Sequence, residues 1–103
     1  MSKSTVITED HLDLIHFIGQ HSKVSQRQIA QNTGLSIGKV NYCIKALIEI
    51  GYIKINNFSN SDRKLNYAYT LTPKGIAEKT RIAENFIIKN KKEYDKLRSY
   101  MED

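Results

Sequence analysis

The sequence predicts a single α+β domain that ends in a long helix. Two short helical segments joined by a glycine turn occupy 26–45, and two runs of alternating apolar and polar residues follow at 52–58 and 65–71. A third observation is a heptad-spaced series of residues between 76 and 101. A period of 3.6 is typical of amphipathic helices and a period of 2 of half-buried strands. This order predicts a helix-turn-helix followed by a β-hairpin, which together form a winged helix-turn-helix with a three-helix core.

Size and composition agree with one small globular domain. The chain has 103 residues, of which 40% are hydrophobic and 26% charged, enough for a modest core but not for two. Within this one structural domain we expect residues 1–72 to form the winged helix-turn-helix and residues 73–103 to form a C-terminal dimerisation helix. The net charge of +5 favours a polyanionic partner.

The sequence indicates neither export nor membrane insertion. No apolar run approaches the ~20 residues that cross a bilayer, and residues 1–10 lack the apolar segment of a signal peptide. The single cysteine, Cys43, cannot form an internal disulfide, which fits a reducing compartment. We therefore expect a cytoplasmic protein that does not bind membranes.

The first predicted helix begins after Thr8, whose hydroxyl can cap it. Its apolar residues cover two sides of the helix rather than one. One side consists of Leu12, Ile15 and Ile18. The other side carries Leu14 and Phe17, which we expect to pack against the C-terminal helix or a second subunit.

The helix-turn-helix carries its own start and stop signals. Ser25 and Gln28 have the spacing of a capping box. Gly34 can adopt the left-handed conformation that ends the first helix, and Ser36 can cap the second. The buried stripe of the second helix is expected to consist of Val40, Ile44 and Leu47. The alternative is an ordinary helical hairpin of a small all-α domain.

The last helix opens at Thr72-Pro73, with threonine as the cap and proline at the first helical position. Its heptad seam comprises Ile76, Thr80, Ala83, Ile87, Asn90, Tyr94, Leu97 and Met101. A helix of roughly 30 residues is about 45 Å long, more than a single wing domain can cover. We therefore expect a homodimer, with parallel or antiparallel packing left open. The alternative is a helix that folds back on its own domain.

The second helix of the motif presents a face suited to DNA. Opposite Val40 lie Gly38, Asn41, Tyr42 and Lys45, with Lys39 at the flank. Asparagine can bond adenine through paired donor and acceptor groups, and lysine can reach a phosphate or guanine. No acidic residue occurs between 36 and 48, whereas an ordinary solvated face, the alternative here, usually mixes charges.

Two further groups are expected to contact the DNA backbone. Ser25, Gln26 and Arg27 begin the supporting helix, where amides and a guanidinium can hold a phosphate. Arg63 and Lys64 lie in the predicted wing tip and can reach the minor groove. The predicted DNA-binding residues are Ser25, Gln26, Arg27, Ser36, Gly38, Lys39, Asn41, Tyr42, Lys45, Arg63 and Lys64.

Enzyme and metal chemistry find little support in the sequence. It contains no glycine-rich phosphate loop, nucleophile elbow or His-Glu helix motif. His11, His16 and His21 are five residues apart, so successive rings rotate by about 140° and cannot share a face; we expect them at the surface or its boundary. Cys43 is expected in the core. We therefore predict no enzyme, no cofactor and no metal.

The segment from Ser25 to Lys79 resembles winged-helix transcriptional regulators of the MarR family, and most of all the exopolysaccharide-associated branch. The resemblance lies in SQRQIAQNTGLSIGKVNYCIKALIEIGYIKINNF and YAYTLTPKGIAEK. It implies a homodimer that binds a near-palindromic site in double-stranded DNA through a recognition helix at 36–50, near polysaccharide genes. The alternative function is a winged-helix protein-interaction module without DNA binding.

Two departures from the family pattern matter. Many members carry Asp-x-Arg in the wing, whereas this chain has Asp62-Arg63-Lys64, so the basic residue that contacts DNA is left open. Typical members also have longer flanking helices that build a ligand pocket. A small-molecule effector is therefore not implied for this chain.

Overall fold

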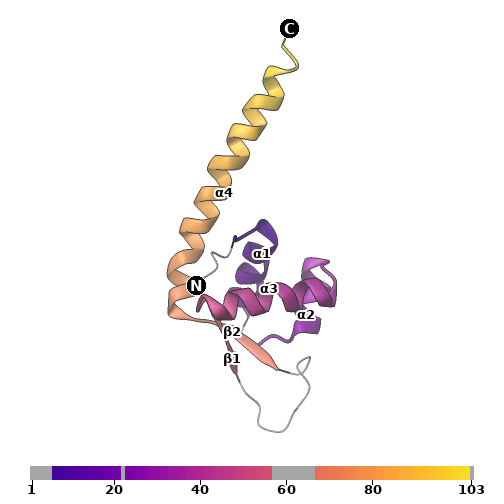
Figure 1. The fold of residues 1–103 in the computed structure, drawn as a ribbon, viewed down its shortest axis with the longest axis vertical. Coiled ribbons are helices and arrows are strands. Elements are labelled where there is room, and N and C mark those ends of the chain that lie inside the picture. Colours follow the sequence, from indigo (N-terminus) through magenta and orange to yellow (C-terminus); the bar gives the residue numbers. More distant parts are fainter. Residues whose placement is uncertain (1–5, 22, 57–66, 103) are drawn as a thin grey trace.

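The computed structural model describes residues 6–21, 23–56 and 67–102 (Figure 1). Its elements, in order, are α1 (Glu9–Gln20), α2 (Gln26–Thr33), α3 (Ile37–Glu49), β1 (Ile53–Asn56), β2 (Ala68–Leu71) and α4 (Pro73–Ser99). This is the predicted order, so the fold class is confirmed as α+β, with a three-helix core, a hairpin and a long C-terminal helix.

The core lies where α1, α2 and α3 meet the hairpin. Val40, Ile44 and Leu47 are all buried there, which confirms the predicted stripe of α3. The buried cluster also contains Leu14, Ile15, Ile18, Val24, Ile29, Cys43, Tyr52, Ile53, Tyr69 and Ile82. Because these residues come from every element of the domain, the position of α3 depends on the hairpin as well as on the other helices.

Capping hydrogen bonds start α2 and α3 at the predicted residues. At the start of α2, Ser25 Oγ accepts from the Gln28 amide at 3.1 Å and Gln28 Oε1 accepts from the Ser25 amide at 2.9 Å. Gly34 ends α2 with φ +78°. Ser36 Oγ then accepts from the Lys39 amide at 3.1 Å and starts α3. These short-range bonds form the tight turn of the helix-turn-helix.

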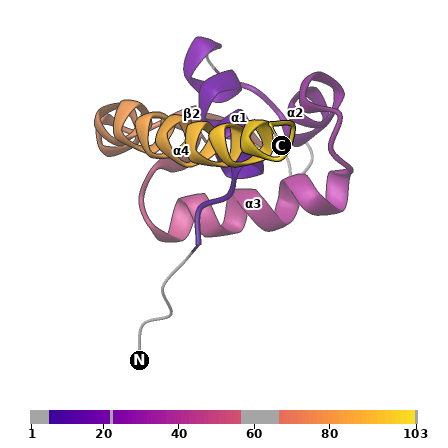
Figure 2. The ribbon, with the colours of Figure 1, turned by 90° about the horizontal axis from the view of Figure 1, so that it is seen from above.

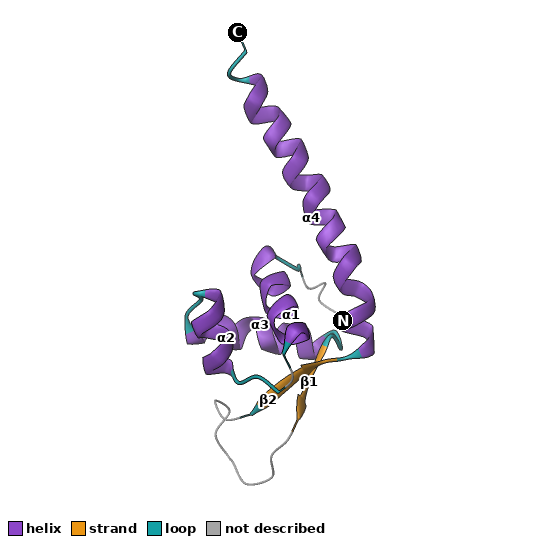
Figure 3. Ribbon diagram, turned by 180° about the vertical axis from the view of Figure 1, so that it is seen from behind, coloured by secondary structure: helices purple, strands orange, loops and turns teal. Residues whose placement is uncertain are grey.

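The wing is an antiparallel pair of strands, in which Ile53 is opposite Leu71 and Asn56 is opposite Ala68. Gly51, with φ +85°, turns the chain from α3 into β1. Figure 3 shows the two strands side by side below the helices. The predicted wing tip, with Arg63 and Lys64, and the outer ends of the predicted strands lie outside the described residues.

The long helix α4 leaves the domain at a steep angle (Figure 1), and the molecule is 63 Å along its longest axis. Its first turn is anchored, since Thr72 Oγ1 donates to the Gly51 carbonyl and accepts from the Gly75 amide at 3.0 Å. A Cβ at Gly75 would lie 2.2 Å from the Tyr52 carbonyl oxygen, so glycine permits this close approach. The described residues from 87 onward are exposed.

One expectation for α1 is narrowed and another is wrong. Leu14 is 0% exposed, which excludes the second subunit as its partner, whereas α1 does pack against the C-terminal helix α4, and also against α2, α3 and β2, within one chain. Phe17 is half-buried beside the His21 ring, with ring centroids 4.3 Å apart. His11, expected near the surface, is 3% exposed. Both sides of α1 are therefore covered within the monomer.

Candidate nucleic-acid interface

One side of α3 is turned to solvent and lacks acidic residues. We call it the α3 face, and it consists of Gly38, Lys39, Asn41, Tyr42 and Lys45. Asn41 is half-buried and the other four are exposed, with Tyr42 at 64%. Figure 2 shows α3 along one flank of the molecule, free of α4. The structure thus places all five predicted residues together, opposite the buried Val40.

Lys39 has an acidic neighbour that the spacing of α3 could not reveal. Its Nζ lies 3.7 Å from Asp10 Oδ2, at the start of α1, and 5.6 Å from the centre of the Tyr42 ring. Both side chains of the ion pair are substantially exposed, and exposed pairs are worth little. Lys39 can therefore exchange this carboxylate for a DNA phosphate.

The start of α2 only partly matches the predicted phosphate clamp. Arg27 is exposed and Ser25 is partly exposed. The Gln26 side chain, by contrast, is 1% exposed, and its Nε2 donates to the Tyr69 hydroxyl at 2.9 Å. The Gln26 side chain therefore cannot contact DNA, whereas a phosphate contact through the amides at this helix start stays a prediction. Burial raises the pKa of Tyr69, against a smaller opposite effect of the Gln26 hydrogen bond, so the hydroxyl stays protonated.

A small hollow separates α3 from the hairpin. It has a volume of about 110 Å³ and is lined by Asn41 and Lys45 of α3, by Ile55 of β1, and by Tyr67 and Tyr69. The exposed Lys54 of β1 adds a cation on the hairpin. Lys54 was not predicted as a site residue, although the alternation of the strand already placed it opposite the buried Ile53.

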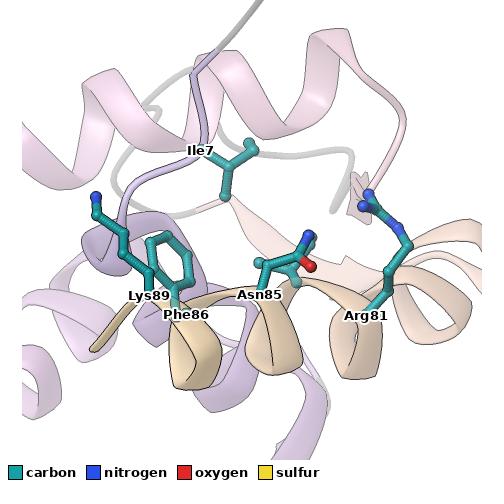
Figure 4. Close-up of a pocket in the computed structure, with 6 residues that line it drawn as sticks. Ile7, Arg81, Asn85, Phe86 and Lys89 are labelled. Atoms are coloured by element: carbon teal, nitrogen blue, oxygen red, sulfur yellow. The ribbon is translucent and has the colours of Figure 1, made fainter. Parts of the chain in front are cut away.

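A second hollow lies beside α4, and its lining comes from α4 and Ile7 rather than from α3. Figure 4 shows Arg81, Asn85, Phe86 and Lys89 of α4 around it, with Ile7 from the segment before α1. Its volume is about 270 Å³. Nη2 of Arg81 lies 2.6 Å from Oε1 of Glu78. This ion pair raises the pKa of the Arg81 guanidinium.

The predicted dimerisation residues of α4 fall into two groups. Ala83 is half-buried and Asn90 bonds back to the domain, its Nδ2 donating to Glu9 Oε1 at 3.3 Å. The exposed group forms what we call the α4 stripe, which consists of Ile76, Ile87, Tyr94, Leu97 and Met101. All five are large apolar side chains with more than half of their surface in solvent.

Metal and redox sites find no support in the described part of the chain. It contains no group of three or more His, Cys, Asp or Glu residues that could hold a metal ion. Cys43 is buried, and this burial raises the pKa of its thiol, so the thiolate form is disfavoured. None of the described helices is both long and apolar enough to cross a membrane.

Comparisons with known proteins agree with this geometry. Residues 11–54 match a family described as winged helix-turn-helix DNA-binding. No curated protein sequence matches the chain. Among solved structures, the chain is similar to Staphylococcus aureus MarR in complex with salicylate and kanamycin, with 21% identity and a TM-score of 0.67 over 88% of this chain and 59% of that chain.

Two further solved structures share the fold. A MarR/EmrR family transcriptional regulator from Acinetobacter sp. ADP1 is 30% identical, with a TM-score of 0.63 over 85% of this chain and 60% of that one. A mutant of ZitR from Lactococcus lactis in the apo form is 21% identical, with a TM-score of 0.63 over 89% of this chain and 67% of that one. The chain thus spans about 60% of the first two regulators' lengths. The family match at residues 11–54 and the solved structures thus agree on a winged helix-turn-helix fold, and the first two of these structures are of MarR and of a MarR/EmrR family regulator.

Proposed function

We propose that this protein is a sequence-specific, double-stranded DNA-binding regulator of transcription that acts as a homodimer. The observation that carries the proposal is the α3 face, an exposed helical surface with two lysines, an asparagine and a tyrosine but no carboxylate of its own. A helix of this kind fits the major groove. The winged helix-turn-helix match and the MarR-family neighbours favour a regulator over an enzyme.

Three residues of the α3 face have distinct roles in this proposal. Asn41 pairs with an adenine edge, and Lys45 reaches a guanine or a phosphate. Gly38 has no side chain and faces open space on α3, so it allows a close approach of the duplex. Arg27 and Ser25 contact a backbone phosphate at the start of α2, and Ser36 contacts one at the start of α3. The predicted wing contacts of Arg63 and Lys64 remain part of the proposal.

The homodimer is proposed from the α4 stripe. Exposed apolar side chains repeated along one helix are typical of an unfilled coiled-coil seam. Two copies joined there would present two α3 faces to one duplex. Because half-sites of helix-turn-helix dimers are about 34 Å apart or a multiple of this distance, the binding site is expected to be near-palindromic.

The target genes are proposed from sequence resemblance alone. The segments SQR, GKVNYCIKAL and NF resemble the exopolysaccharide-associated branch of the MarR family. We therefore place the regulator in the cytoplasm, acting on polysaccharide-biosynthesis genes. The effector and the sign of regulation are left open.

The test is to recover genomic DNA fragments with the purified protein and to measure their affinity by fluorescence anisotropy. The proposal expects specific fragments, and an affinity that falls steeply with salt because phosphate contacts release counterions. No binding of any duplex at ~50 mM salt, where even non-specific binders are retained, would contradict it. A pull-down that recovers a protein partner without enriched DNA would then favour the protein-interaction module.

A further inference from the structure

The first residue of α2 buries a polar side chain where an apolar one would fill the same space. Gln26 is 1% exposed, and burying an amide is unfavourable unless it is hydrogen-bonded. Its Nε2 donates to the hydroxyl of Tyr69 at 2.9 Å, across 43 positions of sequence. Core filling does not require this pair, since Leu and Phe have similar shapes without the polar atoms.

The partner of Gln26 is also the residue through which the hairpin joins the helix-turn-helix. The Tyr69 amide donates to the Val24 carbonyl at 2.8 Å, and the Val24 amide donates to the Tyr69 carbonyl at 3.3 Å. In Figure 3 the segment before α2 runs beside β2. Three hydrogen bonds thus tie the wing strand to the two residues that flank the Ser25 cap.

This tie lies directly behind the proposed DNA surface. Gln26 and Tyr69 line the hollow together with Asn41 and Lys45 of α3 and with Tyr67 beside β2. The pair therefore lies between α3 and the hairpin, where a bond can fix how far the α3 face lies from the hairpin. A duplex has fixed groove spacing, so a protein that contacts it through both elements binds best when their separation is already correct.

We propose that Gln26 and Tyr69 are a positioning pair that sets the separation between the α3 face and the wing for DNA binding. This rests on the proposed function. Neither side chain touches DNA; the side-chain bond restricts rotation of the hairpin about the backbone bonds at Val24. Without the bond the hairpin can turn away from α3, so fewer complexes hold the duplex through both elements at once, and the affinity falls.

The test compares Tyr69→Phe, Gln26→Leu and the double variant with Tyr52→Phe as the matched control. Tyr52 is a second buried tyrosine, but it faces α4, with Lys74 Nζ 5.7 Å from its ring centre. The probe is a fluorescent duplex that the wild-type protein recovers from genomic DNA. Affinity is measured by anisotropy over a series of salt concentrations, and stability by urea unfolding.

We expect Tyr69→Phe to weaken DNA binding about five- to tenfold, the factor that one neutral hydrogen bond supplies. The slope of log affinity against log salt should also become shallower, because fewer phosphates are held at once. Tyr52→Phe should leave both quantities unchanged. The double variant should regain stability, since no buried polar atom is left unpaired, yet still bind weakly.

A merely structural role gives a different pattern. In that case affinity follows the folded fraction, the salt slope does not change, and the double variant binds like the wild type; any of these results would overturn the positioning role. If the double variant does not fold, Tyr69→Phe and its salt slope decide the question. A wild-type protein that binds no duplex overturns the proposed function and this inference together.

Discussion

Two helical surfaces of this molecule are exposed for different physical reasons. The α3 face is polar and carries cations without a carboxylate of its own. The α4 stripe is apolar, and both signs of charge lie beside it, as in the Lys91–Asp95 pair at 3.1 Å. A surface of one sign suits a polyanion, whereas an exposed apolar stripe suits another protein surface. One chain therefore presents a surface suited to nucleic acid on α3 and a surface suited to protein on α4.

Removing the apolar character of the α4 stripe should have the largest effect. We expect Ile87→Asp combined with Leu97→Asp to convert the proposed dimer into a monomer, because four charges would face each other in the seam. Loss of bivalent binding should weaken DNA affinity by about a hundredfold or more. Sedimentation velocity at tens of micromolar measures the first effect and anisotropy the second.

Lys92→Asp is the matched control, since Lys92 is exposed on α4 but outside the heptad seam. It should leave the dimer intact. If the wild-type protein is a monomer, or if a dimer survives both aspartates, the α4 stripe is not the dimer contact and the proposed difference between the two surfaces is wrong.

One glycine in each of the two helices tests how closely that helix is packed. Gly75→Ala should destabilise the fold by about 1–3 kcal/mol, because the new methyl group overlaps the Tyr52 carbonyl and the anchor of α4 must shift. Gly38→Ala meets open space on α3 and should stabilise the helix by up to about 1 kcal/mol. Urea unfolding measures both. Equal effects of the two substitutions would contradict the packing seen at Gly75.

Lys45→Ala tests the α3 face itself. We expect DNA binding to weaken by about 1–3 kcal/mol if the ammonium reads a base edge, with no change in the free energy of unfolding. If Lys45 holds a phosphate, binding should weaken equally for all sequences and the salt slope should decrease by about one. Affinity unchanged from the wild type on a confirmed operator would exclude both roles; Lys92→Ala controls for the lost charge.

The smallest expected effect is a pH dependence of the stability that comes from His11. Burial, and to a lesser extent Lys39, lower the pKa of His11 from its ordinary 6.5. The unfolded chain therefore takes up a proton at a higher pH than the folded one, so stability is fully present above about 6.5 and is lost as the pH falls toward the folded-state pKa. Thermal unfolding between pH 5 and 8 measures it.

His11→Gln is the variant that tests this effect. His11 Nδ1 accepts from the Thr8 amide at 3.0 Å, a role that glutamine fills at the same helix position. Its Nε2 is buried without a hydrogen-bond partner among the described residues. The variant should show a flatter pH dependence than the wild type. An equally steep curve would assign the effect to other groups.

The parts of the fold that sequence reasoning predicted well are those decided by residues close in the chain. The Ser25–Gln28 capping box, the Gly34 exit and the buried stripe of α3 each depend on neighbours within one or two helical turns. The same holds for the grouping of the α3 face, because a helix places residues four apart on one side whatever lies beneath it.

Sequence reasoning did not decide the answer where it depended on distant segments. For Leu14 it left the C-terminal helix and a second subunit open, because a helical wheel shows two apolar sides but not what covers each of them. Gln26 was placed in a phosphate clamp formed at the start of the helix, and its side-chain partner, Tyr69, was missed because it is 43 positions away.

By itself, the sequence determined the order of elements, the start and end of the helices and the acid-free face of α3, since all of these follow from local spacing and residue type. Only the tertiary structure decided that α1 is covered on both sides, that Asp10 neighbours Lys39, and that Tyr69 ties the wing to α2. The physical reason is that burial and long-range hydrogen bonds are properties of the packed chain, and no local period encodes which side chain lies across a core.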